Sequence, residues 1–208
     1  MGPPFSSNEE ANGRHGLVAT ARATILSRAV AIASVDGLEG LSIKMLASGL
    51  GLSASDVSVL FGNRQALQLE VLDTTIEIFI AAIVKPALEE SNSTKRLLRL
   101  CEGWFDYVEQ RGLGGCILYA AAEEYRSRPG PVRDRVNFHR TAWLGLLKAT
   151  IAKAQRAAEF ERDIDVEQLT FELTAFQEAA HFAAIAGDQA AFLRARNSCR
   201  DRIEGRIR

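Results

Sequence analysis

The sequence lacks the features that mark membrane and secreted proteins. Its 208 residues contain no run of about 18 uncharged apolar residues, the length that a membrane-spanning helix needs. The N-terminus has no basic start followed by an apolar run, so we expect no secretory signal. These two absences predict a cytoplasmic protein with no membrane partner.

Cysteine and proline are both scarce. The three cysteines, Cys101, Cys116 and Cys199, are widely spaced and odd in number, which fits neither a disulfide framework nor a zinc site. A reducing compartment suits such free thiols. The five prolines leave room for long helices, because a proline inside a helix interrupts it.

Patterns that carry catalysis are lacking as well. No phosphate-cradling glycine loop, histidine-rich metal spacing or nucleophile elbow occurs. Glu123 and Glu124 are adjacent, so on a helix they point about 100° apart and do not form a pair. Cys116 follows two glycines and is either a reactive thiol at a helix start or, more commonly, a buried structural cysteine. We therefore predict no enzyme, no cofactor and no bound metal.

What the sequence does contain is helical periodicity. Hydrophobic residues make up 47% of the chain and charged residues 25%, which is ordinary for a globular protein, and the net charge is only −1. Apolar residues recur at helical spacing and no segment has the alternation of a strand. The pattern predicts an all-α protein of about nine helices, among them 20–36, a long helix from Asn63 to Pro86, 93–111, 116–126, 132–160, 166–186 and 189–204.

Residues 41–65 predict two short helices joined by a tight turn. Ser42 can cap the first helix, and Gly51 lets the chain leave it through a left-handed backbone conformation. Ser53 can cap the second helix and Asn63 the next. Two helices joined by a glycine-containing turn of about four residues form a helix-turn-helix unit, which places its second helix in a DNA major groove.

An ordinary helical hairpin inside a core would show the same short pattern, so the flanking sequence matters. Residues 20–72 resemble, without a gap, the N-terminal DNA-binding domain of the TetR family of bacterial transcriptional repressors. The resemblance rests on Arg22-xx-Ile25-Leu26-xx-Ala29, Asp36-Gly37, Leu41-Ser42-Ile43, Leu46-Ala47, Gly51-Leu52-Ser53 and Phe61-Gly62-Asn63-Arg64-Gln65-Ala66-Leu67.

The resemblance implies a division of the chain. The polar segment 1–13 is expected to be disordered. Residues 14–66 would form a three-helix DNA-binding domain, and residues 67–208 a larger helical domain that binds an effector and dimerises. A second, less specific resemblance, to the ligand-binding region of one TetR branch common in actinobacteria, rests on Gly114-Gly115-Cys116, Ala121-Ala122-Glu123-Glu124 and Arg128-Pro129-Gly130-Pro131-Val132-Arg133.

DNA binding needs cations at phosphates and other side chains at base edges. Between residues 14 and 64 five basic residues face three acidic ones, a modest excess. Helix starts also favour phosphate, which makes the basic residues near them sensible clamps, although solvated surface charge is the alternative. The residues expected to contact DNA are Arg22, Ser42, Lys44, Ser53, Ala54, Ser55, Ser58, Val59 and Arg64.

The second helix of the unit departs from the family pattern. The family usually carries an aromatic residue that contacts phosphate at the position of Ser58, and often another at that of Leu60. Asp56 would repel phosphate, although it could accept a hydrogen bond from a cytosine amino group. Arg64 stands where the family has a lysine, which conserves the charge.

Aromatic residues in the second half of the chain fall on the helices that enclose the ligand pocket of the family. Each is either a pocket wall or, more often, an ordinary core residue. The expected ligand-binding residues are Phe79, Trp104, Phe105, Tyr119, Phe138, His139 and Trp143. Residues 166–186 are apolar on most of the helix surface, which predicts cover by a partner subunit. The expected dimer contacts are Leu169, Phe176, His181, Phe182 and Phe192.

The tail 194–208 carries six arginines, which are either a solvated helix end or a second nucleic-acid contact. Taken together, the sequence predicts a ligand-responsive repressor that binds a palindromic, double-stranded DNA operator as a homodimer. A small apolar effector would release it. The alternative is an apolar-ligand-binding helical dimer whose specific DNA binding is weakened or lost.

Overall fold

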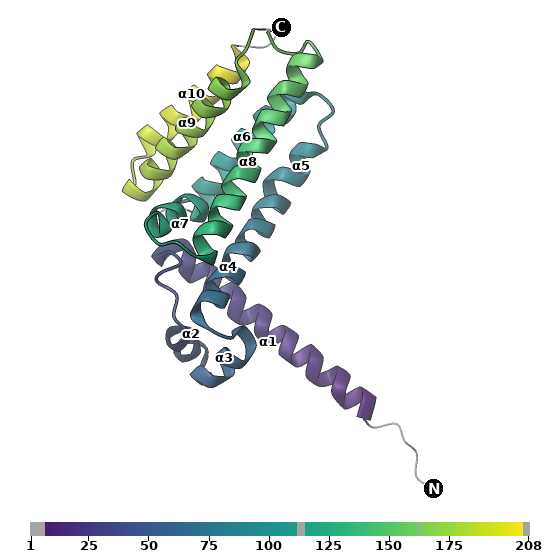
Figure 1. Cartoon of the computed structure of the whole chain (residues 1–208), viewed down its shortest axis with the longest axis vertical. Helices are drawn as coiled ribbons and strands as arrows, with labels where there is room; N and C mark the ends of the chain where they lie inside the picture. The colour runs from purple at the N-terminus through teal and green to yellow at the C-terminus, as the bar shows by residue number, and fades with distance from the viewer. Residues whose placement is uncertain (1–6, 112–114, 162, 206–208) are drawn as a thin grey trace.

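The computed structural model describes residues 7–111, 115–161 and 163–205, with most side chains from residue 20 onward. Every element in that part of the chain is a helix, so the prediction of an all-α fold is confirmed. Figure 1 shows a small head of short helices at one end of a larger helical body. The elements are α1 (Ser7–Asp36), α2 (Ile43–Leu50), α3 (Ala54–Phe61), α4 (Arg64–Phe79), the π-helix η1 (Ile80–Val84), α5 (Lys85–Leu88), α6 (Ser93–Arg111), α7 (Ile117–Tyr125), α8 (Pro131–Arg156), α9 (Val166–Ala186) and α10 (Gln189–Glu204).

Helix α1 begins earlier than its apolar stripe indicates. Residues 7–13 are helical, so the expectation of disorder was wrong for them, while residues 1–6 lie outside the described residues. The segment from Ser7 to Asp36 contains no proline that would interrupt a helix. Figure 1 shows this part of α1 extending away from the head.

The head is held by caps and by a small apolar core. Ser42 Oγ accepts from Met45 N at 3.1 Å and Asn63 Oδ1 accepts from Ala66 N at 2.9 Å, which confirms both predicted caps. Gly51 ends α2 at φ 68°, the left-handed conformation that glycine adopts without strain. Behind the turn, α1 to α4 enclose Ile25, Leu38, Leu41, Leu46, Val57 and Phe61.

The helical rod that begins with α4 does not end before Pro86. The chain continues through η1 into α5, and Pro86 lies in the first turn of α5. Proline has no N–H to donate and its ring crowds the carbonyl one turn earlier. The wider π-turn of Ile80–Val84 accommodates that defect without breaking the rod. In Figure 1 the rod α4–η1–α5 therefore runs from the head along the whole body.

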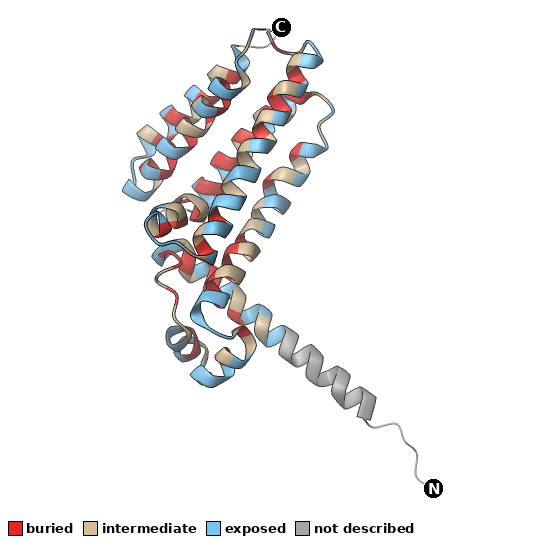
Figure 2. Ribbon diagram, in the orientation of Figure 1, coloured by how far each residue is buried: buried red, intermediate tan, exposed pale blue. Residues whose placement is uncertain are grey.

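The core of the body forms where α6, α8, α9 and α10 face one another (Figure 2). Trp104 and Phe105 on α6, with Phe160 and Phe192, are its largest fully buried side chains. The ring centroids of Phe105 and Phe192 lie 5.8 Å apart, edge to face. Phe192 and Leu169, both expected at a dimer interface, are thus packed inside their own subunit.

Helix α8 is shorter at its C-terminus than predicted. It ends at Arg156 rather than near Phe160, and Ala158 adopts a left-handed φ of 56°. This turn buries Phe160 in the core and brings the Glu159 carboxylate to Thr94 N, at 2.9 Å, at the start of α6. Burial of the Phe160 ring and the hydrogen bond to the start of α6 together outweigh the intrinsic helix preference of Ala157 and Ala158.

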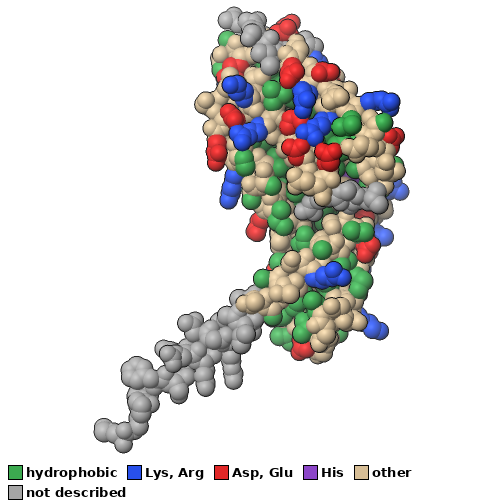
Figure 3. All heavy atoms as spheres, turned by 180° about the vertical axis from the view of Figure 1, so that it is seen from behind, with side chains coloured by type: hydrophobic (Ala, Val, Ile, Leu, Met, Phe, Trp, Pro, Cys, Tyr) green, Lys and Arg blue, Asp and Glu red, His purple; other side chains and the backbone are tan. Residues whose placement is uncertain are grey.

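Charged side chains on the body are largely paired. Arg196 on α10 lies 2.6 Å from both Glu102 and Asp106 on α6, and Arg200 lies 2.8 Å from Glu102. Figure 3 shows basic and acidic side chains interspersed over the body, and few charges on the visible face of the head. Arg196 and Arg200 of the tail thus hold α10 to α6, while Arg206 and Arg208 lie outside the described residues.

No single helix in the described ranges is long and apolar enough to cross a membrane. Helices α2 and α3 reach that length and apolarity only when taken together, across a bend of 119°.

His181 is another expected dimer residue that belongs to the interior. Its ring stacks on Tyr119, with centroids 5.5 Å apart, and its Nδ1 accepts the Cys116 backbone N–H at 3.1 Å. Burial lowers the pKa of His181 below its ordinary value. The neutral imidazole therefore joins α9 to the start of α7.

The stability of the fold should decrease in acid partly because of His181. The unfolded histidine binds a proton near pH 6.5, above the folded pKa, so its contribution is complete above about pH 6.5 and is lost as the pH falls. His181→Phe keeps a ring but removes the acceptor, and should lower the free energy of unfolding by about 1–3 kcal/mol near neutral pH. Denaturant titrations at several pH values should show a shallower acid dependence for the variant, and identical slopes would contradict this role.

Candidate DNA-binding surface and ligand cavity

The outer face of α3 carries small side chains. Ala54 and Ser55 are exposed, Ser58 is half-buried, and Val59 is 85% exposed, while Val57 points inward. The head thus presents the side chains that the sequence assigned to DNA contact, on the helix that follows the turn. None of them is large, so the helix can approach a groove closely.

Asp56 acts as a structural cap on this helix. Its carboxylate accepts from Ser53 N at 3.1 Å and from Ser53 Oγ at 2.6 Å, while Ser53 Oγ accepts from Asp56 N, which completes a capping box. The hydrogen bonds from Ser53 lower the pKa of Asp56. Ser53, expected at the DNA, is therefore engaged with Asp56, and its Oγ also lies 2.7 Å from Ser55 Oγ.

Two of the three expected phosphate clamps are bound within the head. Arg22 forms a two-pronged pair with Glu70 on α4, with Nη2 at 2.7 Å from Oε2, and its guanidinium lies 4.9 Å from the Phe61 ring centroid. Arg64 donates through Nε to Leu41 O at 2.7 Å and through Nη2 to Glu39 O. Helix-to-loop bracing is their observed role, because the planar guanidinium can satisfy several acceptors at once.

Lys44 differs from these arginines. It is exposed on α2, one residue into the helix, and within the described head its ammonium group has no acidic partner. Ser42, just before it, is half-buried and occupied as the helix cap. Lys44 is therefore the cation of this set that remains available to a phosphate.

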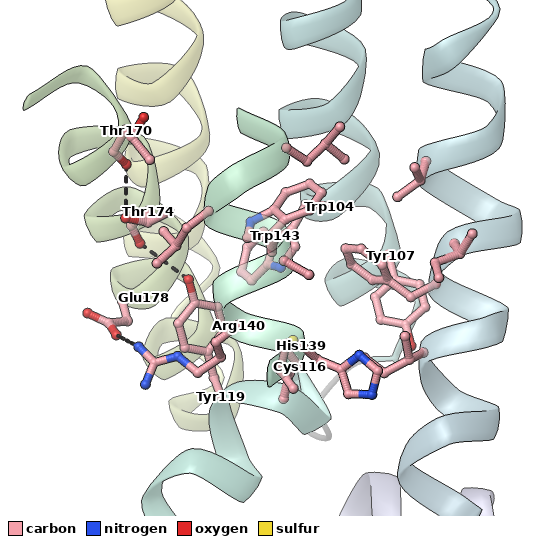
Figure 4. Close-up of a pocket in the computed structure, with 18 of the residues that line it drawn as sticks. Trp104, Tyr107, Cys116, Tyr119, His139, Arg140, Trp143, Thr170, Thr174 and Glu178 are labelled. Atoms are coloured by element: carbon pink, nitrogen blue, oxygen red, sulfur yellow. Dashed lines mark hydrogen bonds and ion pairs between the residues drawn. The ribbon is translucent and has the colours of Figure 1, made fainter. Parts of the chain in front are cut away.

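A cavity of about 500 Å³ opens in the body between α4, η1, α6, α7, α8 and α9 (Figure 4). This volume is typical of sites for small organic molecules. Five of the expected ligand residues line it: Phe79, Trp104, Tyr119, His139 and Trp143.

Two expected ligand residues lie elsewhere. Phe105 is fully buried in the core against Phe192 of α10 and does not line the cavity, and Phe138 is 65% exposed on the outside of α8. Each is adjacent in sequence to a true lining residue, Trp104 or His139, and adjacent positions on a helix point about 100° apart. Residue type indicated an aromatic pocket. Which aromatic residues line it depends on how each helix is rotated about its own axis.

The apolar walls of the cavity are aromatic rings in edge-to-face contact. Phe79 lies 5.2 Å from Trp143 and 5.4 Å from Tyr107, and Trp104 lies 5.9 Å from Tyr119, between ring centroids. Tyr107 also lines the cavity, although it is not among the seven residues predicted to bind the ligand. Its spacing of three from Trp104 on the same helix was a usable signal.

The polar wall of the cavity comes from α9. Thr170, Thr174 and Glu178 repeat every four residues along one face, and Figure 4 shows them opposite the aromatic rings. Glu178 pairs with Arg140 at 3.5 Å, and the threonine hydroxyls donate to carbonyls one turn back. The second charged pair of the lining joins Lys148 to Glu167, so the charges of the wall cancel.

His139 connects the cavity wall to α4. Its Nε2 lies 3.3 Å from Asp73 Oδ1, and Asp73 also pairs with Arg135. The histidine is thus partly used as a tie between α4 and α8. No group of three or more potential metal ligands occurs among the described residues.

The outer surface of α9 and α10 keeps exposed apolar side chains. Phe182, expected at a dimer interface, is 55% exposed, with Phe171 at 66%, Ile185 at 46% and Leu193 at 42%. Phe176 is only half-buried and packs against the core.

A helix-turn-helix head joined by one continuous rod to a cavity-bearing helical body defines a class, the helix-turn-helix transcriptional regulators. Residues 93–199 match the family model described as the tetracyclin repressor-like C-terminal domain, and the chain belongs to the TetR family. No curated protein matches the chain.

Solved structures share the fold across nearly the whole chain. A TetR-family transcriptional regulator from Cytophaga hutchinsonii is 21% identical, with a TM-score of 0.79, covering 90% of this chain and 95% of that one. A TetR transcriptional regulator from Chloroflexus aurantiacus is 19% identical, with a TM-score of 0.79 and coverage of 92% and 98%. A protein from Saccharomonospora viridis described as a transcriptional regulator, in complex with choline, is 22% identical, with a TM-score of 0.77 and coverage of 91% and 98%.

Mutation should distinguish the exposed Lys44, which is available to DNA, from Arg64, which is bound within the head. Lys44→Ala should weaken DNA binding about equally for all sequences and lower the salt dependence by about one charge, with an unchanged melting temperature. Arg64→Ala leaves backbone carbonyls without their donor and should lower the free energy of unfolding by about 1 kcal/mol. Salt-dependent binding titrations and thermal melts of both variants provide the measurement. If the Arg64→Ala protein keeps its stability and only its DNA affinity decreases, Arg64 contacts DNA phosphate after all.

Proposed function

We propose that the protein is a ligand-responsive transcriptional repressor, which binds a palindromic operator as a homodimer and is released by a small apolar effector. The observation that carries this proposal is the continuity of α4. The helix starts in the head at Asn63, and further along it Thr75, Ile76 and Phe79 line the cavity. A ligand in the cavity therefore touches the element that carries the head.

The composition of the cavity supports an uncharged effector. Its rings form an apolar slot, and its two acidic residues, Glu167 and Glu178, each already have a cationic partner. An ionic ligand would have to displace one of those pairs. A neutral molecule with one hydrogen-bonding end near Thr174 and Arg140 needs no such exchange.

A cationic effector is the second candidate. Aromatic side chains recognise quaternary ammonium groups, and the related structure from Saccharomonospora viridis is in complex with choline. Here the rings of Trp104, Tyr119 and Trp143 line the cavity, but the nearby Glu178 faces Arg140. The neutral effector accordingly fits the charge balance better.

Two heads are needed to read a palindromic operator. The exposed apolar residues of α9 and α10 supply the surface for a two-fold partner, and helix faces of this kind are seldom left in water when they form a contiguous patch. Within the dimer, two copies of α3 would enter successive major grooves about 34–36 Å apart.

Mobility-shift titration on the DNA upstream of the chain's own gene tests the function. A repressor should show sequence preference and a steep decrease of affinity with salt. Sequence-blind binding, or none, would favour the alternative of a ligand-binding dimer that has lost its operator.

The effector is testable in the same samples. Both tryptophans of the chain line the cavity, so their fluorescence should change when a neutral apolar compound binds. Ala175→Phe fills the cavity and should abolish both this change and the release from DNA. Ala82→Phe, at an exposed alanine of η1 that does not line the cavity, should retain both. A parallel titration with choline tests the cationic effector. Equal loss in the two variants would contradict the assignment of the cavity.

The dimer surface has its own prediction. A double change, Phe182→Glu with Ile185→Glu, places charge in the proposed contact and should shift sedimentation from dimer to monomer. Leu88→Glu, at an exposed leucine on α5, is the matched control and should remain dimeric. A double variant that stays dimeric at micromolar concentration would move the interface elsewhere.

A further inference from the structure

A second cavity, of about 340 Å³, lies where the head meets the body. Its walls come from the start of α4, the end of α7 and the start of α8, three segments that pack together in Figure 1. It contains none of the aromatic residues of the first cavity and shares no lining residue with it. The two cavities therefore differ in chemistry.

This junction cavity is strongly basic. Arg64, Arg128 and Arg133 line it, with Glu39 as its acidic residue. Glu39 Oε2 lies 2.7 Å from Arg128 Nη1 and 3.3 Å from Arg64 Nη2, so one carboxylate serves two guanidinium groups. Among the lining residues the cations outnumber the carboxylates, and two further carboxylates lie outside the lining: Asp134, 4.0 Å from Arg133, and Glu124, within electrostatic reach of Arg128. A concave surface with more cations than anions in its lining concentrates anions.

Arg133 is the incompletely satisfied member of the cluster. Its Nε is buried and has no hydrogen-bond acceptor among the described residues, and it lies 4.0 Å from Asp134 Oδ1, beyond hydrogen-bond distance. The Arg133 side chain as a whole is 36% exposed, so the unmet donor is the buried Nε–H alone. A buried N–H without an acceptor is uncommon in native proteins. An anion in the cavity would supply that acceptor.

The surrounding backbone leaves room for such a group. Gly130 precedes α8 at φ 141°, and no atom lies within 4 Å of where its Cβ would be. The helix has no side-chain cap at Gly130, and its first residue, Pro131, has no N–H, so the amide groups of Val132 and Arg133 are the ones that can donate in addition to the guanidinium groups.

We propose that the junction cavity binds a small molecule bearing a phosphate or pyrophosphate group. A guanidinium group can bind a phosphate through two parallel N–H···O bonds, and three arginines line this cavity. The anion would compete with Glu39 for Arg128 and Arg64. Because the cavity joins residues of the head to residues of the body, occupancy changes the ties between them, and any effect on DNA affinity is reciprocal.

The proposal is tested by titrating inorganic pyrophosphate into the full-length protein by calorimetry at constant ionic strength, without DNA. Saturable binding of one pyrophosphate per subunit is expected. Arg133→Gln and Arg128→Gln should each weaken it about tenfold. Arg126→Gln, on the same end of α7 but outside the cavity and paired only with Glu123, should leave it unchanged. Absence of saturable binding, or equal weakening by Arg126→Gln, would overturn the site.

A variant that should bind pyrophosphate more tightly distinguishes loss of the site from unfolding of the protein. Glu39→Gln removes the competing carboxylate and should tighten pyrophosphate binding several-fold, which an unfolded protein does not do. Weaker binding in this variant would also contradict the proposal.

The DNA backbone is the other possible source of phosphate. Repeating the titration with saturating operator duplex separates the two, since a small-molecule site should retain its stoichiometry. Displacement of pyrophosphate by duplex would assign the cavity to DNA phosphate instead. The titration without DNA does not depend on the protein being a repressor, so failure of that function and failure of this site are distinguishable.

Discussion

The arrangement of head and body depends on the carboxylate of Glu124 at the end of α7. Its Oε2 accepts the backbone amides of Leu38 at 3.0 Å and Glu39 at 3.2 Å, in the loop that follows α1. Burial raises the pKa of Glu124, and the negative charge of Glu39 raises it further, whereas a hydrogen bond from Tyr125 lowers the pKa of Glu39. Gly37 permits this approach, since a Cβ there would lie 1.5 Å from Glu124 Oε1. The loop between α1 and α2 is thereby attached to the body.

Helix α7 consequently has two functions along its short length. Ile117, Leu118 and Tyr119 line the cavity, while Glu124 and Tyr125 hold the head, less than two turns further on. A helix of nine residues behaves as a rigid piece, so a displacement at one end reaches the other. The rod α4–η1–α5 makes the second connection, and its π-turn lies beside the cavity.

Local chemistry in the sequence predicted the short-range features of the fold. The caps at Ser42, Ser53 and Asn63 and the glycine after α2 follow from residue type alone. Long-range partners were beyond the same reasoning: nothing near Arg64 in sequence indicates that it binds the carbonyls of Leu41 and Glu39. The cavity was predictable as a set of helices rich in aromatic residues. Its membership was not, because a single step along a helix separates a wall residue from a core or surface residue.

The pairing of charges explains why an uncharged effector could act on a head that it does not touch. The ties between head and body are hydrogen bonds and ion pairs with specific partners, such as Glu124 with two amides and Tyr125 with Glu39. The aromatic wall of the cavity is instead apolar and contacts its neighbours without direction, so it can adjust to a ligand at low cost. A ligand shifts the equilibrium only by its difference in affinity between two arrangements. Helices α7 and α4 contact both the cavity and the head. Repacking of their cavity ends can be gradual, whereas the hydrogen bonds at their head ends are either made or lost. This combination favours two discrete positions of the head over a continuous range.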